Sequence, residues 1–189
     1  MSYELLSALA SIGTFVVIAA TAVAAFVQLR HVRGSNAIAA LTECREVLES
    51  EAFAKAQRFV RHELPALLKD ESVRRELLKS PLPERLWPIN VIGNFFESLG
   101  AFVRHGIIDK EIALSLWSAV VMRSWEDLSP TLAIMRRTGG ASLWEQFEYL
   151  ASISKAWLDR HSDGDYPPGA EHMPIVDVWL EADKATSRA

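Results

Sequence analysis

A stretch of 25 residues without a charged side chain, from Leu5 to Leu29, constrains this chain more than any other feature. At about 1.5 Å per residue, a helix of that length is roughly 37 Å long, which exceeds the roughly 30 Å hydrocarbon core of a bilayer. We therefore predict a single N-terminal transmembrane helix between Leu5 and Leu29. The rest of the chain is then expected to lie at a membrane surface.

The charges that flank this stretch predict its orientation. The N-terminal flank carries only the α-amino group and Glu4, whereas Arg30, His31 and Arg33 follow the stretch. By the positive-inside rule, the N-terminus is expected outside and residues 30–189 in the cytoplasm, as in a single-pass protein of the cell inner (plasma) membrane. Arg30 and Arg33 orient the helix but are too few for a polybasic lipid-binding cluster.

A cleaved signal peptide is the alternative interpretation, because Ala22-Val23-Ala24 has the small-x-small pattern of a cleavage site. The residues before the apolar stretch include no Lys or Arg, and the stretch far exceeds the usual length of about 7 to 15 residues. These two departures favour an uncleaved anchor.

Charge and cysteine content narrow the class of protein. All 20 Lys and Arg residues lie at or beyond Arg30 and 23 of the 24 acidic residues lie beyond Glu4, so the part after the anchor carries a net charge of −3. Nucleic acid is not expected as a partner, because phosphate binding needs a concentrated positive field. Cys44 is the only cysteine, so no internal disulfide is possible and a reducing compartment is expected.

Apolar residues at helical spacing predict an all-α fold, in which an antiparallel helical bundle follows the transmembrane helix. Three parts are expected: an anchor with its basic flank (1–33), the helical bundle domain (34–161) and a loop-rich C-terminal tail (162–189). Gly34-Ser35 is expected to break the helix after the anchor. The helices expected next are a long or double helix up to Pro65, with Ser50 as a cap or kink within it, a short one around 73–79, then 86–105 with Gly106 as its stop, 109–128 with Asp109 as its cap, a short one from Pro130 to Gly139, one from Ser142 to about His161, and one turn near 178–182. Ser142 followed by Glu145 three residues later has the pattern of a capping box.

The helix expected at 86–105 carries the candidate polar site. Asn94 and Glu97 lie three residues apart on its polar stripe, and Arg123 or His62 is a candidate partner in a buried polar pocket. The alternative is a helix boundary, where the amide and carboxylate cap or bridge neighbouring helices. On the same helix, Gly93 and Gly100 are expected to let a neighbouring helix approach closely.

No catalytic, cofactor or metal motif emerges from the pattern. The five histidines lack the spacing of a metal site in a helical bundle. The segment Asp159 to Asp165 begins like a calcium-binding EF-hand loop, but position 3 is His161 and position 12 is Ala170. Arg58, Arg61 and His62 are interpreted as a solvated face rather than an anion site. We expect no cofactor, and whether the protein is an enzyme stays open, with the pattern leaning against it.

Several segments together resemble an uncharacterised bacterial family, domain of unknown function 4760. They are Q-L-R-H-V-R-x-S-N at 28–36, R-F-V-R-H-E-L-P at 58–65, N-F-F-E-S-L-G at 94–100, G-I-I-D at 106–109 and W-E-D-L-S-P at 125–130. The resemblance covers roughly residues 25 to 160. It implies a small membrane-anchored helical protein and supplies no known activity, substrate or catalytic residue.

Three hypotheses for function follow. The first is a protein-interaction or scaffold module at the cytoplasmic face, acting through a protein partner or as a homo-oligomer, with exposed aromatics such as Trp87, Trp144 or Trp179 for docking. The second is a membrane-associated enzyme or effector that uses the polar face around Asn94 and Glu97. The third is a membrane-perturbing effector of cell defence, which rests on the architecture alone.

Overall fold

The computed structural model describes residues 3–186, and the side chains of all of these except 4–11, 29–35, 182, 185 and 186. Every regular element within that range is helical, which confirms the predicted all-α class. The elements in order are α1 (Tyr3–Glu49), α2 (Glu51–Arg58), a π-helical turn η1 (Phe59–Glu63), α3 (Leu64–Leu67), α4 (Glu71–Glu76), a 3-10 turn η2 (Glu84–Leu86), α5 (Trp87–Arg104), α6 (Lys110–Gly139), α7 (Glu145–Arg160) and α8 (Leu180–Thr186).

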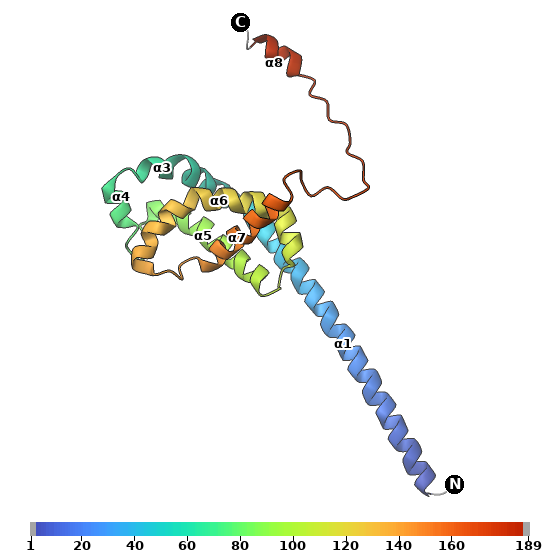
Figure 1. Cartoon of the computed structure of the whole chain (residues 1–189). Coiled ribbons are helices and arrows are strands. Elements are labelled where there is room, and N and C mark those ends of the chain that lie inside the picture. The colour runs from blue at the N-terminus through green and yellow to red at the C-terminus, as the bar shows by residue number, and fades with distance from the viewer. Residues whose placement is uncertain (1–2, 187–189) are drawn as a thin grey trace.

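Helix α1 is a single rod of 47 residues, about 70 Å long, that extends well beyond the rest of the fold (Figure 1). It continues through Gly34 and Ser35, so the predicted break there is wrong. A glycine inside a helix costs only about 1 kcal/mol relative to alanine, and no proline or left-handed residue interrupts the chain at this point. Among the described side chains of α1, those of its last turns pack on the body of the protein, through the buried Cys44 and the half-buried Leu41 and Leu48.

The N-terminal part of α1 presents its side chains to the surroundings. Every side chain from Ile12 to Gln28 is exposed, including Phe15 and Phe26, which are 71% and 68% exposed. Across the described residues, no helix has both the length and the apolar character that a membrane span requires.

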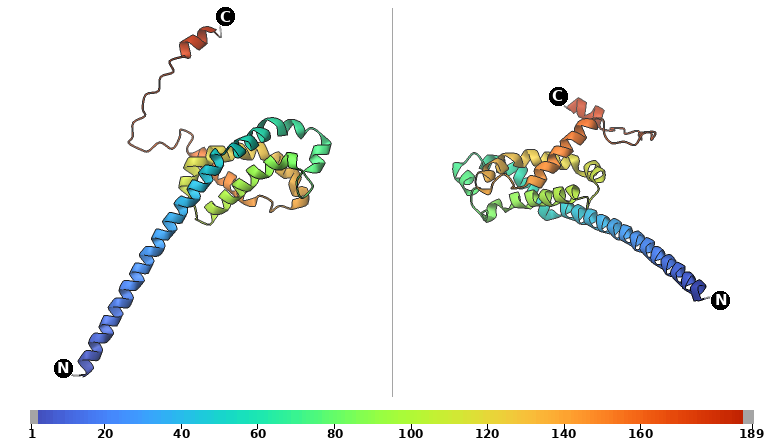
Figure 2. Two further views of the ribbon diagram at one scale, coloured as in Figure 1. Left: turned by 180° about the vertical axis from the view of Figure 1, so that it is seen from behind. Right: turned by 60° about the horizontal axis from the view of Figure 1, so that its bottom comes forward.

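The body is organised around α5, with α6 and α7 reversing the chain direction in turn (Figures 1 and 2). Phe96 of α5 is completely buried, and its ring stacks on Phe147 of α7 with 4.9 Å between centroids. The Phe53 ring of α2 lies edge-on to the Phe96 ring, with 6.1 Å between centroids. The Trp125 ring of α6 lies edge-on to the Phe147 ring, with 5.2 Å between centroids. These rings tie four helices into one core, which is why α5 is apolar over about half of its circumference.

Two prolines that the sequence predicts as helix boundaries lie within continuous helical paths. Before Pro65 the chain widens into the π-helical turn η1, in which the Leu64 N–H reaches the Phe59 carbonyl, and the helical path then continues into α3. Pro130 lies inside the 30-residue α6, so the predicted separate helices 109–128 and 130–139 are one. An interior proline costs about 3 kcal/mol or more, and burial of Leu128 and Leu132 on either side of it offsets this cost.

Several predicted helix ends are confirmed. The Ser50 hydroxyl accepts a hydrogen bond from the Phe53 N–H at 3.2 Å, and the Asp109 carboxylate accepts one from the Ile112 N–H at 3.1 Å. Gly106 takes a left-handed φ of +67° directly after α5 ends. In the tail, the predicted turn near 178–182 is displaced, because α8 begins at Leu180.

The two glycines of α5 allow the close approach that the sequence predicts, and Gly100 offers a sharp test. A Cβ atom at Gly100 would collide with the backbone carbonyl of Gln146 in α7. We expect Gly100→Ala to lower the free energy of unfolding by about 1–3 kcal/mol, although alanine is the better helix former. Thermal unfolding of the purified full chain, followed by circular dichroism, measures this loss.

Gly139→Ala is the matched control. A Cβ there would meet only the end of the flexible Leu143 side chain at 3.2 Å, so this variant should unfold at or slightly above the wild-type temperature. Equal effects of the two substitutions would contradict the close α5–α7 contact.

Candidate functional site

The predicted polar residues of α5 lie where α7 begins. The Asn94 side-chain oxygen accepts a hydrogen bond from the Trp144 indole N–H at 3.0 Å. The Glu97 carboxylate accepts one from the backbone N–H of Phe147 at 2.9 Å. Both bonds cross from α5 to the first turn of α7, so the two residues join helices, as the helix-boundary interpretation describes.

The start of α7 needs this outside acceptor because of its local backbone. Trp144, at the N-cap position, has a left-handed conformation (φ 53°, ψ 43°), and its side chain has no oxygen with which to cap the helix. Glu97 takes over that role from a neighbouring helix, and its negative charge suits the positive end of the helix dipole. The predicted capping box between Ser142 and Glu145 is therefore wrong, since α7 begins at Glu145 itself.

Two arginines hold the same end of α7 from other directions. Arg136 of α6 donates to the Leu143 carbonyl at 3.0 Å and pairs with Glu148 at 2.7 Å. Arg104, in the last turn of α5, donates to the side-chain oxygen of Gln146 at 3.1 Å. The first turn of α7 is thus held from both α5 and α6.

Arg123 does not join Asn94 and Glu97. Its side chain is exposed on α6, and in the described part of the chain no hydrogen bond or ion pair links it to either residue. His62 is likewise exposed, and Arg61 instead pairs with Asp127 at 3.2 Å. Trp144, which the sequence suggests as an exposed docking aromatic, is only 3% exposed, with its ring over Gly93.

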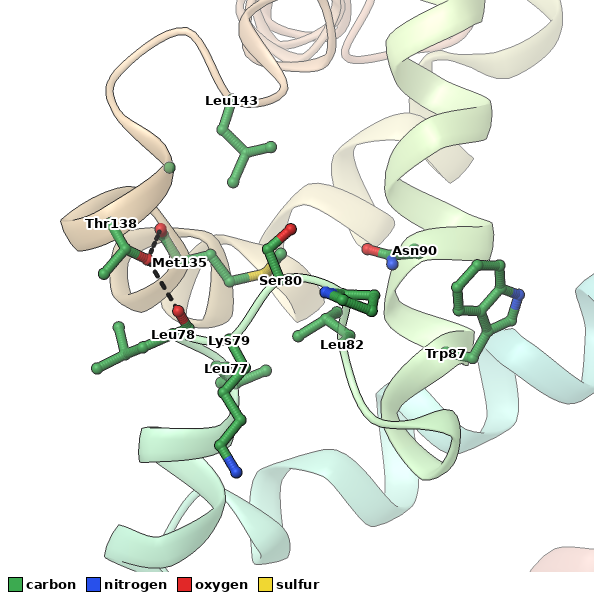
Figure 3. A pocket seen from close by; sticks show the side chains of 12 residues that line it. Leu77, Leu78, Lys79, Ser80, Leu82, Trp87, Asn90, Met135, Thr138 and Leu143 are labelled. Carbon is green, nitrogen blue, oxygen red and sulfur yellow. Dashed lines mark hydrogen bonds between the residues drawn. The ribbon is translucent and has the colours of Figure 1, made fainter.

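A pocket of about 430 Å³ lies on the side of the body where residues 77–82 meet the start of α5 and the end of α6 (Figure 3). Its walls are mostly apolar, and its polar lining groups are Ser80, Asn90, Thr138 and Lys79. The Thr138 hydroxyl donates to the Leu78 carbonyl at 3.3 Å, which ties α6 to the loop. The apolar lining residues are Leu77, Leu78, Pro81, Leu82, Trp87, Met135 and Leu143.

The lining suits binding rather than acid–base chemistry. Lys79 is the one charged residue in the lining, so the pocket offers no pair of groups to give and take a proton. Trp87 is 54% exposed on the α5 side, so a large aromatic surface stands beside an apolar hollow with a few hydrogen-bonding groups. Sequence reasoning names Trp87 but misses the pocket, because its walls combine residues 77–90 with residues 135–143, which lie far apart in the sequence.

The groups with shifted pKa values lie away from this pocket. Burial, with a smaller effect of Glu43, raises the pKa of the Cys44 thiol, which packs between α1 and the body. The Ser72 backbone N–H lowers the pKa of Asp70 at the start of α4. Among the described residues, no group of three His, Cys, Asp or Glu side chains is placed to hold a metal ion.

The EF-hand-like segment, Asp159 to Asp165, forms local contacts. Asp159 pairs with Lys155 at 2.6 Å, and Asp165 lies 3.9 Å from the His161 ring nitrogen. Gly164 has a left-handed φ of +92°, as a turn residue does. These contacts account for the segment as a helix end and a turn.

Comparison with known proteins gives one match. The family model described as "Domain of unknown function (DUF4760)" matches residues 14–157, which run from within the apolar part of α1 almost to the end of α7. No curated protein and no solved structure matches the chain.

The contact between Glu97 and α7 makes a prediction about stability. Glu97→Ala removes the acceptor of the Phe147 N–H and should lower the free energy of unfolding by about 1 kcal/mol, the usual cost of losing a helix cap. Glu97→Gln keeps a side-chain oxygen at the same position and should cost clearly less. Chemical unfolding of the two variants beside wild type measures both effects, and an equal loss in both would contradict the capping role.

Proposed function

Since this chain belongs to the domain of unknown function 4760 family, whose description states no activity, we propose from its own residues that it is a membrane-anchored protein-interaction module. In this proposal, α1 anchors the chain in the inner (plasma) membrane, and the body faces the cytoplasm. The pocket beside Trp87 then receives an apolar side chain of a protein partner.

The exposed apolar part of α1 is the observation that carries the anchor. Seventeen consecutive residues, 12–28, are exposed, and none of them is charged. A contiguous apolar surface of this size is unfavourable in water and marks a lipid or protein contact. The charge-free stretch of the sequence is longer, from Leu5 to Leu29, and matches the thickness of a bilayer core.

Orientation in the proposal rests on Arg30 and Arg33. They follow the apolar stretch directly, while the N-terminal flank is close to neutral. The positive-inside rule then places the body on the cytoplasmic side.

The pocket supports a binding role for the body. An exposed tryptophan beside an apolar hollow is the arrangement that anchors protein contacts most strongly. The polar groups of Ser80, Asn90 and Thr138 lie in the same pocket and could orient a partner's backbone (Figure 3).

The alternative, an enzyme or defence effector working through Asn94 and Glu97, receives no such support. Both side chains use an oxygen to hold the start of α7, and Arg123 does not approach them. If Glu97 is catalytic, Glu97→Gln should abolish the biological effect of the protein while the protein remains folded. The binding proposal predicts that this variant retains the effect.

Extraction from membranes tests the anchor. We expect the wild-type chain to remain in the membrane pellet at alkaline pH, because lipid surrounds the apolar part of α1. Val16→Arg combined with Ile18→Arg should shift the protein to the soluble fraction, since each arginine costs about 2.5 kcal/mol or more at the centre of a span. Val16→Leu with Ile18→Leu is the matched control, and release of the wild-type chain would contradict the anchor.

Site-specific photocrosslinking tests the pocket. A photoreactive residue at Trp87 should crosslink to one defined protein species, while the same residue at the exposed Glu126 of α6 should not. Leu143→Asp places a charge on the pocket wall and should abolish the crosslink without lowering the unfolding temperature by more than a few degrees. Persistence of the crosslink in Leu143→Asp, or a strictly monomeric protein with no crosslinked species, would overturn the pocket as a binding site.

A further inference from the structure

One end of the body lies closer than the rest to the N-terminal part of α1. It is the turn between α5 and α6, residues 105–109, with the first turns of α6, and all the views place it on the side from which α1 arrives (Figures 1 and 2). The opposite end of the body is formed by α3 and α4. If α1 is anchored as proposed above, the α5–α6 turn is therefore the part of the body that faces the membrane.

Large apolar side chains are exposed at this end. Leu116 and Ile112, four residues apart on α6, are 61% and 46% exposed, and Ile107 in the turn is 45% exposed. On α1, Ile38 is 67% exposed. Leu116 and Trp117 of α6 line an open groove of about 350 Å³ with Leu41, Thr42, Arg45 and Glu49 of α1, and Leu41 lies about one helical turn from Ile38. We call Ile38, Ile107, Ile112 and Leu116 the apolar patch.

The spacing along α1 gives the distance from the apolar stretch to Ile38, the member of the apolar patch that lies on α1 itself. Ile38 follows Leu29 by nine residues, or about 13 Å of helix. The headgroup layer adds about 5–8 Å to each side of the hydrocarbon core. Membrane helices tilt by about 20° on average and by up to about 40°, and such a tilt brings one side of the body down to the headgroups.

We propose that the apolar patch docks on the surface of the same bilayer that holds α1, so that the anchored body lies against the membrane. The inference rests on the proposed anchor. Its partner is a phospholipid surface, and α1 supplies the proximity, because a tethered second contact acts at a high effective concentration. Insertion of a few large apolar side chains at the headgroup boundary is how interfacial segments bind membranes.

The charges around the apolar patch define the lipid that it accepts. The formal charges of Arg104 and Lys110 are balanced by those of Asp109 and Glu111, and in the groove Arg45 pairs with Glu49 at 2.7 Å, so these residues carry no excess of either sign. Attraction to anionic headgroups is therefore a minor contribution, and the contact is apolar. Docking is expected on phosphatidylcholine alone, and added phosphatidylglycerol should change it little.

Fluorescent labels in the full chain test this proposal. Each variant carries one cysteine in a Cys44→Ala background, labelled with the environment-sensitive dye NBD and reconstituted in phosphatidylcholine nanodiscs. The test positions are Ile112 and Leu116, the far-end control is Lys69 between α3 and α4, and Ile18 reports on the anchor. All four side chains are exposed, so labelling should leave the fold intact.

We expect a blue-shifted emission and at least twofold quenching by headgroup nitroxide lipids at positions 112 and 116, and neither effect at 69. Ile112→Glu, added to the variant labelled at Leu116→Cys, should abolish the quenching at position 116. If the label at 18 is shielded from aqueous quenchers while 112 and 116 respond like 69, the anchor stands and the docking is overturned. If the label at 18 is as accessible to aqueous quenchers as the label at 69, the anchor fails and the docking with it.

Disulfide formation between Leu116→Cys chains that persists on dilution with excess lipid would show that a second copy covers the apolar patch, and would also overturn the proposal.

Discussion

The hydrogen bond from the Phe147 N–H to the Glu97 carboxylate is the contact on which the arrangement of the body depends. It supplies the cap that α7 lacks, and it is formed where Gly93 and Gly100 let the two helices approach closely. The stacked Phe96 and Phe147 rings lie beside it. The polar contact and the stacked rings therefore hold α5 and α7 in the same register.

Much of the fold follows from local sequence patterns. The apolar face of α5, the caps at Ser50 and Asp109 and the glycine stop at Gly106 are all predicted, because each depends on residues within a few positions of each other. The errors at Gly34, Pro65 and Pro130 share one cause. A local signal for ending a helix is worth a few kcal/mol at most, and tertiary packing or the helical preference of both flanks can exceed it.

The contacts of the candidate site, in contrast, do not follow from local sequence patterns. The sequence identifies Asn94 and Glu97 as notable, but their bonding partners lie 50 residues away at Trp144 and Phe147, and no local pattern specifies them. The cap of α7 comes from another helix, so the capping-box pattern at Ser142 misleads. The pocket beside Trp87 combines residues 77–90 with residues 135–143 and appears only when the chain is folded.

The uninterrupted course of α1 through Gly34 has a mechanical consequence. A helix of 47 residues without a joint behaves as a stiff lever whose far end is built into the body through Cys44 and Leu48. Rotating a rod of about 70 Å by about 10° displaces its end by about 12 Å. If α1 is anchored as proposed, a change in the tilt of its N-terminal part, such as one imposed by a thinner or thicker bilayer, is transmitted to the body as a displacement rather than absorbed in a flexible linker.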